Sequence, residues 1–286
     1  MWLPEFEYTK PSNEKELFAL LDKYNDKNVR LLAGGTDLLP TIRSGKLSVN
    51  CLIDINFLSL NEISEKDGSV HIGATVSFRQ LTFNGLIRDK FPALVKAANS
   101  VGAVQTRSLA TIGGNICSAI PSCDSAPILI ALRAKLLLRG RDEQRIVAIE
   151  DFFKGPRSSI LNSDELLYEI IIPLPKNGAK ADFIKFGRRK ALTLAIVNGA
   201  AMLELDKEKK VLDCRIALGA VAPVPVRACE AEAFLIGKKV NYENIDAVSR
   251  IIAREISPIS DIRASAEYRL KMSQVIVKRI LEQCSC

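Results

Sequence analysis

Two pairs of adjacent glycines are the residues of this sequence that could do chemistry through their backbone. The first pair lies in residues 31–37 (LLAGGTD), and the second lies in residues 109–115 (LATIGGN). In both segments a run of mostly apolar residues precedes Gly-Gly, and small polar residues follow. Because glycine has no Cβ, the N–H groups of such turns can approach an anion closely, and the hydroxyls of Thr36 and Thr111 add donors. The two segments together predict a site that grips a pyrophosphate from both sides.

Each glycine pair on its own has a simpler interpretation. A single Gly-Gly more often marks a plain tight turn than a phosphate site. No GxGxxG follows a predicted strand, and GxxxxGK[ST] does not occur. Both absences disfavour Rossmann and P-loop nucleotide binding, so any nucleotide must be held in another way.

Histidine and cysteine usage restricts the remaining catalytic chemistry. His71 is the only histidine, which disfavours histidine metal sites and Ser-His or Cys-His catalysis. The seven cysteines form no CxxC pair, which argues against a disulfide framework and against a zinc or iron-sulfur site made by this chain alone. Cys117 and Cys123 lie near the second glycine pair and invite a redox role. Free cysteine is more often a small buried hydrophobe, and that is what we expect of these two.

Composition and charge indicate a folded globular protein without a nucleic-acid surface. Hydrophobic residues make up 48% of the 286 residues and charged residues 26%. The net charge is +7, but the basic residues are scattered rather than gathered in a stripe. No apolar run reaches the length of a membrane span, and residues 1–10 lack the order of a signal peptide. We therefore expect a cytoplasmic protein that binds neither nucleic acid nor the membrane interior.

The elements that must position the glycine pairs fall into three groups. In the first, a capping box at 13–16 predicts a helix to residue 24, and the pattern predicts a strand, a short helix and a second strand at 29–33, 37–43 and 51–55. In the second group we expect strands at 70–73, 135–139, 145–149 and 166–172 and helices at 78–86, 93–101 and 126–132.

A proline-containing linker at 173–178 separates the third group. Apolar segments at 183–186, 194–205 and 211–221 predict an antiparallel meander, and helices are predicted at 228–235, 245–254 and 264–283. The predicted domains are therefore 1–58, 59–175 and 176–286.

Five motifs in order give the chain a family resemblance. They are Leu31–Asp37 (LLAGGTD), Ala110–Asn115 (ATIGGN) extending to Asp124, Phe183–Lys190 (FIKFGRRK), Leu218–Arg227 (LGAVAPVPVR) and Asp261–Arg269 (DIRASAEYR). Over essentially its whole length the chain resembles the FAD-binding medium subunit of xanthine dehydrogenases and related molybdenum hydroxylases, such as the flavoprotein subunit of CO dehydrogenase.

The resemblance implies an α+β fold. Two domains would hold FAD between them in the manner of the vanillyl-alcohol-oxidase (PCMH) type, and a C-terminal domain would carry a three-stranded antiparallel sheet with helices. It also implies partner subunits. A large subunit would hold the molybdenum cofactor and oxidise the substrate, with a purine as the leading candidate. A small subunit would pass electrons through [2Fe-2S] clusters to FAD, and NAD⁺ or another acceptor would take them.

The resemblance further implies which residues contact FAD. In the first glycine segment the residues at the diphosphate would be Arg30, Leu31, Leu32, Ala33, Gly34, Gly35, Thr36 and Asp37. In the second they would be Thr111, Ile112, Gly113, Gly114 and Asn115. Asp124 would contact the ribityl or adenosine part, Leu166 would pack on the cofactor, and Lys185 would make a polar contact near the flavin ring. Val101 stands where some relatives carry an aromatic residue beside the flavin.

Some of these residues have alternative interpretations, and so does the function. The alternative for Asp124, the less favoured of the two, is to cap a helix that begins near Ser125. Lys185 would serve as a strand lysine that extends to solvent, and Leu166 is a core residue in either case. The rival functions are a stand-alone flavin oxidoreductase that acts directly on a small molecule and a non-catalytic nucleotide-binding assembly module.

Overall fold

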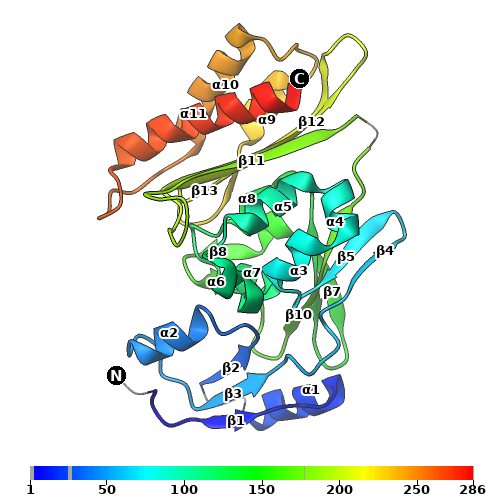
Figure 1. The fold of residues 1–286 in the computed structure, drawn as a ribbon, viewed down its shortest axis with the longest axis vertical. Coiled ribbons are helices and arrows are strands. Elements are labelled where there is room, and N and C mark those ends of the chain that lie inside the picture. Colours follow the sequence, from blue (N-terminus) through cyan, green and yellow to red (C-terminus); the bar gives the residue numbers. More distant parts are fainter. Residues whose placement is uncertain (1–2, 25–27, 177, 286) are drawn as a thin grey trace.

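The computed structural model describes residues 3–24, 28–176 and 178–285 (Figure 1). Figure 1 shows three units stacked along the long axis, in the order of the sequence. The architecture is α+β, as predicted, with a separate sheet in each unit.

The first unit is a parallel sheet between two helices. Its sheet has the order β1 (Glu7–Thr9), β3 (Cys51–Asp54) and β2 (Val29–Leu32), and its helices are α1 (Glu14–Lys23) and α2 (Leu38–Arg43). All four residues of β3 are buried, because α1 packs on Cys51 and Ile53 while α2 and its neighbours pack on Leu52. The predicted strands and helices are confirmed, and β1 is an element that the sequence reasoning missed.

Only half of the predicted capping box forms at the start of α1. The Asn13 side chain accepts a hydrogen bond from the Glu16 N–H, as expected of an N-cap. The Glu16 carboxylate, however, accepts from the N–H and hydroxyl of Ser12 rather than from the cap residue. The start of the helix was therefore predicted correctly, but the hydrogen-bond partner of the Glu16 carboxylate was wrong.

The second unit is an antiparallel sheet covered by short helices. The sheet has the order β4 (Ile63–Lys66), β5 (Ser69–Gly73), β10 (Leu166–Pro173), β6 (Lys135–Arg139) and β7 (Gln144–Ala148). The helices are α3 (Phe78–Phe83), α4 (Gly85–Lys90), α5 (Pro92–Asn99), α6 (Val104–Leu109), α7 (Ile112–Cys117) and α8 (Ser125–Ala131). A short 3₁₀ turn, Ile149–Asp151, leads into the hairpin of β8 (Phe153–Gly155) and β9 (Ser158–Ser159).

Two predictions for this unit need correction. The single helix expected at 78–86 is two helices, because Asn84 leaves the helical conformation (φ −67°, ψ 126°) and its side chain caps α4 by accepting from the Ile87 N–H. The second glycine pair was expected in a turn that presents free N–H groups, and it is part of a helix instead. It lies in the first turn of α7, for which Thr111 is the N-cap.

The third unit is an antiparallel sheet with helices on one face. The strands follow the chain as β11 (Lys180–Phe186), β12 (Val197–Leu205), β13 (Val211–Gly219) and β14 (Val226–Arg227). The helices are α9 (Cys229–Leu235), α10 (Tyr242–Glu255) and α11 (Ala266–Ser285). The predicted meander and helices are confirmed, but the sheet has four strands rather than three, because the two-residue β14 pairs with the end of β13.

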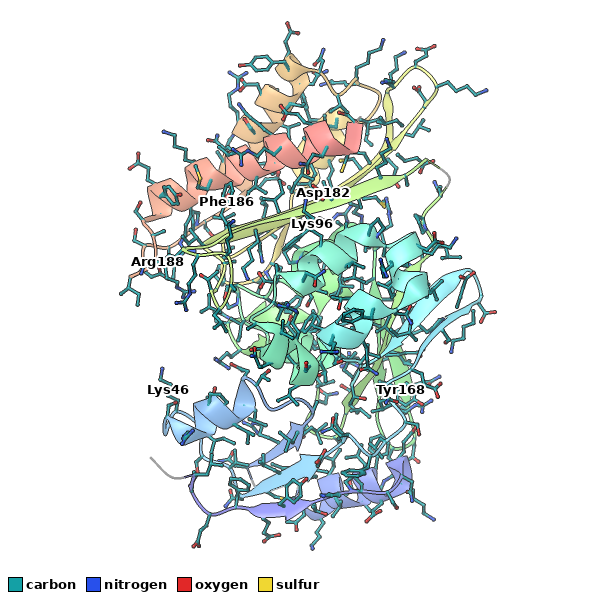
Figure 2. The ribbon with its side chains drawn as sticks, in the orientation of Figure 1. Lys46, Lys96, Tyr168, Asp182, Phe186 and Arg188 are labelled. Carbon is teal, nitrogen blue, oxygen red and sulfur yellow. The ribbon has the colours of Figure 1, made fainter. Side chains whose placement is uncertain are left out.

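The other face of this sheet packs on the second unit. Helix α8 contacts β12 and β13, and α5 contacts β11. Phe183, Ala200 and Ala217 from the sheet belong to the hydrophobic core of the second unit. Lys96 of α5 and Asp182 of β11 lie side by side across this contact, with Lys96 Nζ 2.7 Å from Asp182 Oδ1 (Figure 2). The second and third units therefore share one apolar interior.

Candidate functional site

The two glycine segments, 78 residues apart in the sequence, touch in the structure. The first connects β2 to α2, and the second connects α6 to α7. A Cβ atom built on Gly34 would lie 2.0 Å from the carbonyl oxygen of Leu109, the first residue of the second segment. A Cβ on Gly114 would lie 4.0 Å from the Cβ of Ala33. No residue larger than glycine fits at position 34 without moving one of the backbones.

The first segment presents a row of unused donors. Within the described residues, the backbone N–H groups of Gly34, Gly35 and Thr36 donate no hydrogen bond to the protein. Gly35 has a φ of +67°, a left-handed conformation that favours glycine and turns successive N–H groups toward one side. The segment leads directly into α2, whose N-terminus adds a partial positive charge. This arrangement suits an anion such as a diphosphate.

The second segment differs, because its N–H groups already have protein acceptors. The N–H groups of Ile112 and Gly113 donate to the carbonyl oxygens of Val76 (2.9 Å) and Ala74 (3.0 Å). The Gly114 N–H donates to Thr111 Oγ1 (3.1 Å), and the Asn115 N–H donates to the Thr111 carbonyl. A Cβ on Gly113 would lie 2.5 Å from the Ala74 carbonyl oxygen. These glycines therefore allow close packing, and the backbone donors expected here are used within the fold.

What the second segment offers is the side chain of Asn115. Its Oδ1 accepts from Ser125 Oγ (2.7 Å) and from Cys123 Sγ (3.0 Å). With the oxygen held in this way, the Nδ2 group remains as a donor, and within the described residues it has no hydrogen-bond acceptor. Ser125 and Cys123 flank Asp124, so Asn115 links the glycine segments to that carboxylate.

Burial makes both nearby cysteines poor nucleophiles. It raises the pKa of the Cys117 thiol to about 12 and that of Cys123 to about 11. The thiolate is the reactive form, so these raised pKa values disfavour nucleophilic chemistry at both residues at neutral pH. Cys123 is a buried hydrophobe as expected and also donates a hydrogen bond to Asn115, whereas Cys117 is only partly buried.

Asp124 and Lys185 form a buried ion pair. Lys185 Nζ donates to Asp124 Oδ2 (2.5 Å) and to the Ser100 carbonyl (2.9 Å), and the two side chains are 8% and 10% exposed. Asn198 Nδ2 donates to Asp124 Oδ1 (2.9 Å) and to the Cys123 carbonyl (3.1 Å). Burial raises the pKa of the Asp124 carboxyl, and the hydrogen bonds and charge of its partners oppose that rise.

The ion pair between Asp124 and Lys185 excludes the simpler interpretation of each residue, a helix cap for Asp124 and a solvent-exposed strand lysine for Lys185. Asp124 stands at the N-cap position of α8, but its side chain accepts no capping hydrogen bond. Lys185 points inward rather than to solvent, because its ammonium group is almost fully buried. Val101, 9% exposed, follows the residue whose carbonyl receives Lys185, and so lies beside this pair.

Other predicted contact residues lie on β2 of the first unit or pack against its core. Leu166 is 2% exposed and belongs to the hydrophobic cluster of α1 and β3, so it is a core residue in this structure. Leu31 and Ala33 pack against the same cluster, and Leu32 packs under α2. Arg30 is exposed on the edge strand β2, where its guanidinium donates to the Val29 carbonyl.

Sequence reasoning missed a cation at the first glycine segment. Arg157, at the tip of the β8–β9 hairpin, donates to both carboxylate oxygens of Asp37 (2.9 and 3.2 Å). Its backbone is left-handed (φ +58°), and its N–H donates to the Ala119 carbonyl. The hydrogen bonds to Asp37 raise the pKa of this guanidinium, which stays charged. Only a long-range contact joins Arg157 to Asp37, so no local pattern could have shown the pair.

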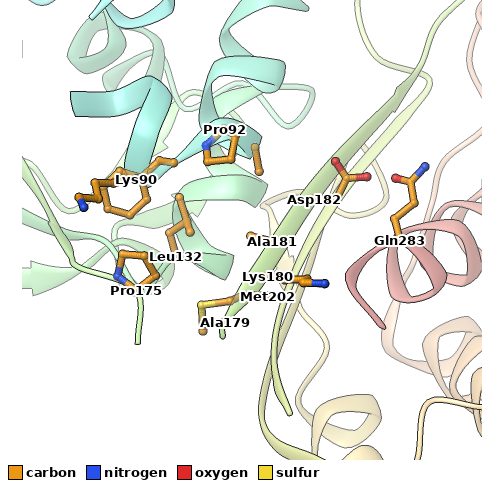
Figure 3. Close-up of a pocket in the computed structure, with 12 residues that line it drawn as sticks. Lys90, Pro92, Leu132, Pro175, Ala179, Lys180, Ala181, Asp182, Met202 and Gln283 are labelled. Atoms are coloured by element: carbon orange, nitrogen blue, oxygen red, sulfur yellow. The ribbon is translucent and has the colours of Figure 1, made fainter. Parts of the chain in front are cut away.

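A pocket of about 380 Å³ lies elsewhere, between α4, α5 and β11 (Figure 3). Its lining is largely apolar and includes Pro92, Leu132 and Met202. None of the predicted site residues lines it. Among the described residues no group of three or more histidine, cysteine or acidic side chains could hold a metal ion, and no helix is long and apolar enough to cross a membrane.

Comparisons with known proteins account for nearly all of the chain. Residues 4–175 match the family described as the FAD binding domain in molybdopterin dehydrogenase, and residues 182–284 match the CO dehydrogenase flavoprotein C-terminal domain. The chain is 33% identical to the glyceraldehyde dehydrogenase medium chain of Sulfolobus acidocaldarius, over 99% of both chains. It is 33% identical to a putative xanthine dehydrogenase FAD-binding subunit of Escherichia coli, over 91% of this chain and 89% of that one.

A solved structure agrees with these matches over the full length. A chain of the carbon monoxide dehydrogenase from Hydrogenophaga pseudoflava superposes with a TM-score of 0.96 at 32% identity, covering 100% of both chains. The unused donors at Gly34, Gly35 and Thr36 fit the diphosphate that such a cofactor brings. The chain belongs to the family of FAD-binding medium subunits of xanthine dehydrogenase, carbon monoxide dehydrogenase and the other molybdenum hydroxylases.

Proposed function

We propose that this chain relays electrons from [2Fe-2S] clusters on a partner subunit, through its own FAD, to NAD⁺ or another acceptor. The observation that carries the proposal is the row of N–H donors at Gly34, Gly35 and Thr36, which find no acceptor in the described part of the chain and have the Leu109 carbonyl on one side. FAD, when bound, supplies the ability to exchange electrons both singly and in pairs. The chain's own residues bind and orient the cofactor.

Each part of the site has a proposed task. The N–H groups of the first glycine segment bind the diphosphate, and the Arg157 guanidinium adds positive charge beside it. The Asn115 amide donates to the cofactor from the second segment. Asp124 accepts from a ribityl or adenosine hydroxyl, and Lys185 lies at the ring end, next to Val101. The remaining predicted contact residues line the site. They are Arg30 to Ala33, Asp37, Thr111 to Gly114 and Leu166.

Catalysis by this subunit needs no acid or base of its own. Oxidation of the organic substrate belongs to a molybdopterin-binding large subunit, and delivery of electrons belongs to an iron-sulfur small subunit. Support for these partners comes from relatives named as medium chains of carbon monoxide dehydrogenase and as FAD-binding subunits of other dehydrogenases. Those relatives also include nicotinate and caffeine dehydrogenase subunits, so the purine substrate stays a prediction. The domain boundaries after residues 58 and 175 and the cytoplasmic location stay predictions as well.

The visible spectrum of the purified full chain tests the cofactor, and anaerobic reduction tests the relay. We expect a flavin spectrum that bleaches with NADH when NAD⁺ is the acceptor, and co-purification of molybdenum and iron-sulfur subunits from the native cells. If the chain holds no flavin after reconstitution with FAD, the remaining function would be that of an assembly module. Turnover of a small organic substrate by the isolated chain would instead favour a stand-alone oxidoreductase.

A further inference from the structure

The start of β12, the end of β13 and the Asp261–Arg269 motif do no chemistry in the function described above. Asn198 at the start of β12 contacts the Asp124 carboxylate, and Arg269 of the motif binds the ends of both strands. We propose that Asn198, Gly219 and Arg269 are positioning residues, through which the third unit fixes the Asp124 carboxylate for cofactor binding. The proposal rests on the proposed function, because it assumes that Asp124 contacts FAD.

Asn198 is the direct link between the third unit and Asp124. It lies on β12, is fully buried, and uses both Nδ2 hydrogens, one on Asp124 Oδ1 and one on the Cys123 carbonyl. Within the described residues its Oδ1 is buried without a hydrogen-bond partner. A buried carbonyl oxygen without a hydrogen bond destabilises the folded state. The hydrogen bond that the Asn198 amide donates to the Asp124 carboxylate explains why an amide occupies this buried position.

Gly219 provides the space in which the Asn198 amide sits. The two residues face each other in the β12–β13 ladder. A Cβ atom on residue 219 would lie 2.2 Å from Asn198 Oδ1. Even an alanine at this position would therefore push the amide away from its place beside Asp124.

Arg269 ties together the strand ends that carry these two residues. It is 2% exposed, and its Nη1 donates to the carbonyls of Ile196, two residues before Asn198, and of Ala220, the residue after Gly219. Its Nη2 donates to Asp261 Oδ1 (2.8 Å), which also accepts from the Arg263 N–H (2.8 Å). Burial disfavours the ionised Asp261, but these donors outweigh it and lower the pKa of its carboxyl to about 2. Arg269 therefore has a permanently charged partner at neutral pH.

The arrangement gives Asp124 one donor from each of two neighbouring strands. Lys185 of β11 takes Oδ2, and Asn198 of β12 takes Oδ1. Without Asn198 the carboxylate would keep only the lysine and could rotate about its Cβ–Cγ bond. The third unit thus acts on the FAD site by holding one carboxylate in a fixed orientation, although it contributes no glycine segment.

A double-mutant cycle on the FAD dissociation constant tests this role with the full chain. We expect Asn198→Ala to weaken FAD binding about tenfold, the typical value of a donor to a charged group. In an Asp124→Ala background we expect Asn198→Ala to cause no further loss, because the carboxylate that it orients is gone. Asn198→Asp, which keeps the side-chain shape, serves as a second variant if Asn198→Ala does not fold, and it should weaken binding at least as much.

The Arg269 part of the proposal has its own matched control. Arg269→Lys should weaken FAD binding about threefold or more, since an ammonium cannot bridge both strand ends. Arg227→Lys alters a more exposed arginine-carboxylate pair, with Glu232, in the same unit away from Asp124, and FAD binding should stay within about twofold of wild type.

Each outcome identifies which claim fails. Additive losses in the cycle, or equal losses in Arg269→Lys and Arg227→Lys, would show a general structural effect and overturn the positioning role. Unchanged FAD binding in Asp124→Ala would overturn this inference while wild-type FAD binding still supported the proposed function. A wild-type chain that binds no FAD would overturn the proposed function itself.

Discussion

The two glycine segments look alike in sequence and differ in what their backbones do. Around Gly34 and Gly35 the N–H groups have no acceptor among the residues that the structure describes, and they follow a left-handed turn. Around Gly113 and Gly114 they donate to Ala74 and Thr111. Gly34 lets one backbone approach another across the junction of two units. Gly113 lets a helix start pack on the end of β5 inside one unit.

The difference shows that a Gly-Gly pair indicates a place where two parts of the backbone, or the backbone and a ligand, come close together. The hydrogen bonds of its N–H groups then decide whether the pair binds a ligand or stabilises the fold. Unused donors next to solvent mark the ligand-binding case. The following substitutions test that distinction.

Gly34→Ala is expected to have the largest effect. The new Cβ would meet the Leu109 carbonyl at 2.0 Å, so one segment must move and the row of donors with it. We expect FAD affinity to fall by about 100-fold or more, measured by titration of the apoprotein. Gly85→Ala is the matched control, since its Cβ would meet nothing within 4 Å. Equal affinities of the two variants would contradict the account.

Gly113→Ala is expected to act on stability before it acts on binding. Its Cβ would lie 2.5 Å from the Ala74 carbonyl oxygen. The free energy of unfolding should fall by about 1–3 kcal/mol in urea denaturation, while the folded fraction still binds FAD. A stable Gly113→Ala protein with no FAD affinity would mean that both segments bind the diphosphate in the same way.

A threonine pair sharpens the contrast. Thr111 is 4% exposed and caps α7, so Thr111→Val should lower the free energy of unfolding by about 1 kcal/mol. Thr36 is exposed, so Thr36→Val should leave stability unchanged and lower only FAD affinity. Thermal unfolding of both apoproteins separates the two effects, and the reverse pattern would exchange the roles assigned to the segments.

Arg157→Gln should give the smallest change. The Arg157 side chain is 54% exposed, so its charge is well screened by solvent. We expect FAD affinity to fall by about threefold, with a weaker dependence of affinity on salt concentration than in wild type. An unchanged salt dependence would show that Arg157 serves only its ion pair with Asp37.

The sequence was sufficient for the elements with a strong repeating pattern. The helices α1, α10 and α11 and the strands β2, β3, β6 and β10 lie where alternation and amphipathic spacing predicted them. The elements that were missed are short or lack such a pattern, among them β1, β4, β14 and α6. A two-residue strand such as β14 gains its identity from pairing with β13 rather than from its own residues.

For the site, the family motifs indicated the right neighbourhoods but not the contacts. The pairing of Asp124 with Lys185 joins residues 61 positions apart, and that of Arg157 with Asp37 joins residues 120 positions apart. Neither partner can be chosen from local spacing, since each depends on how the units pack. The same holds for Ile112 and Gly113 of the second glycine segment, whose N–H groups meet the carbonyls of Val76 and Ala74 only once the residues after β5 lie beside the start of α7.

A crystal structure of the full chain with FAD bound tests the central claim most directly. The account predicts diphosphate oxygens about 2.7–3.2 Å from the backbone nitrogens of Gly34, Gly35 or Thr36, with the hydrogen bonds of Gly113 to Ala74 unchanged. A diphosphate bound by the N–H groups of α7, or lying away from both glycine segments, would contradict it.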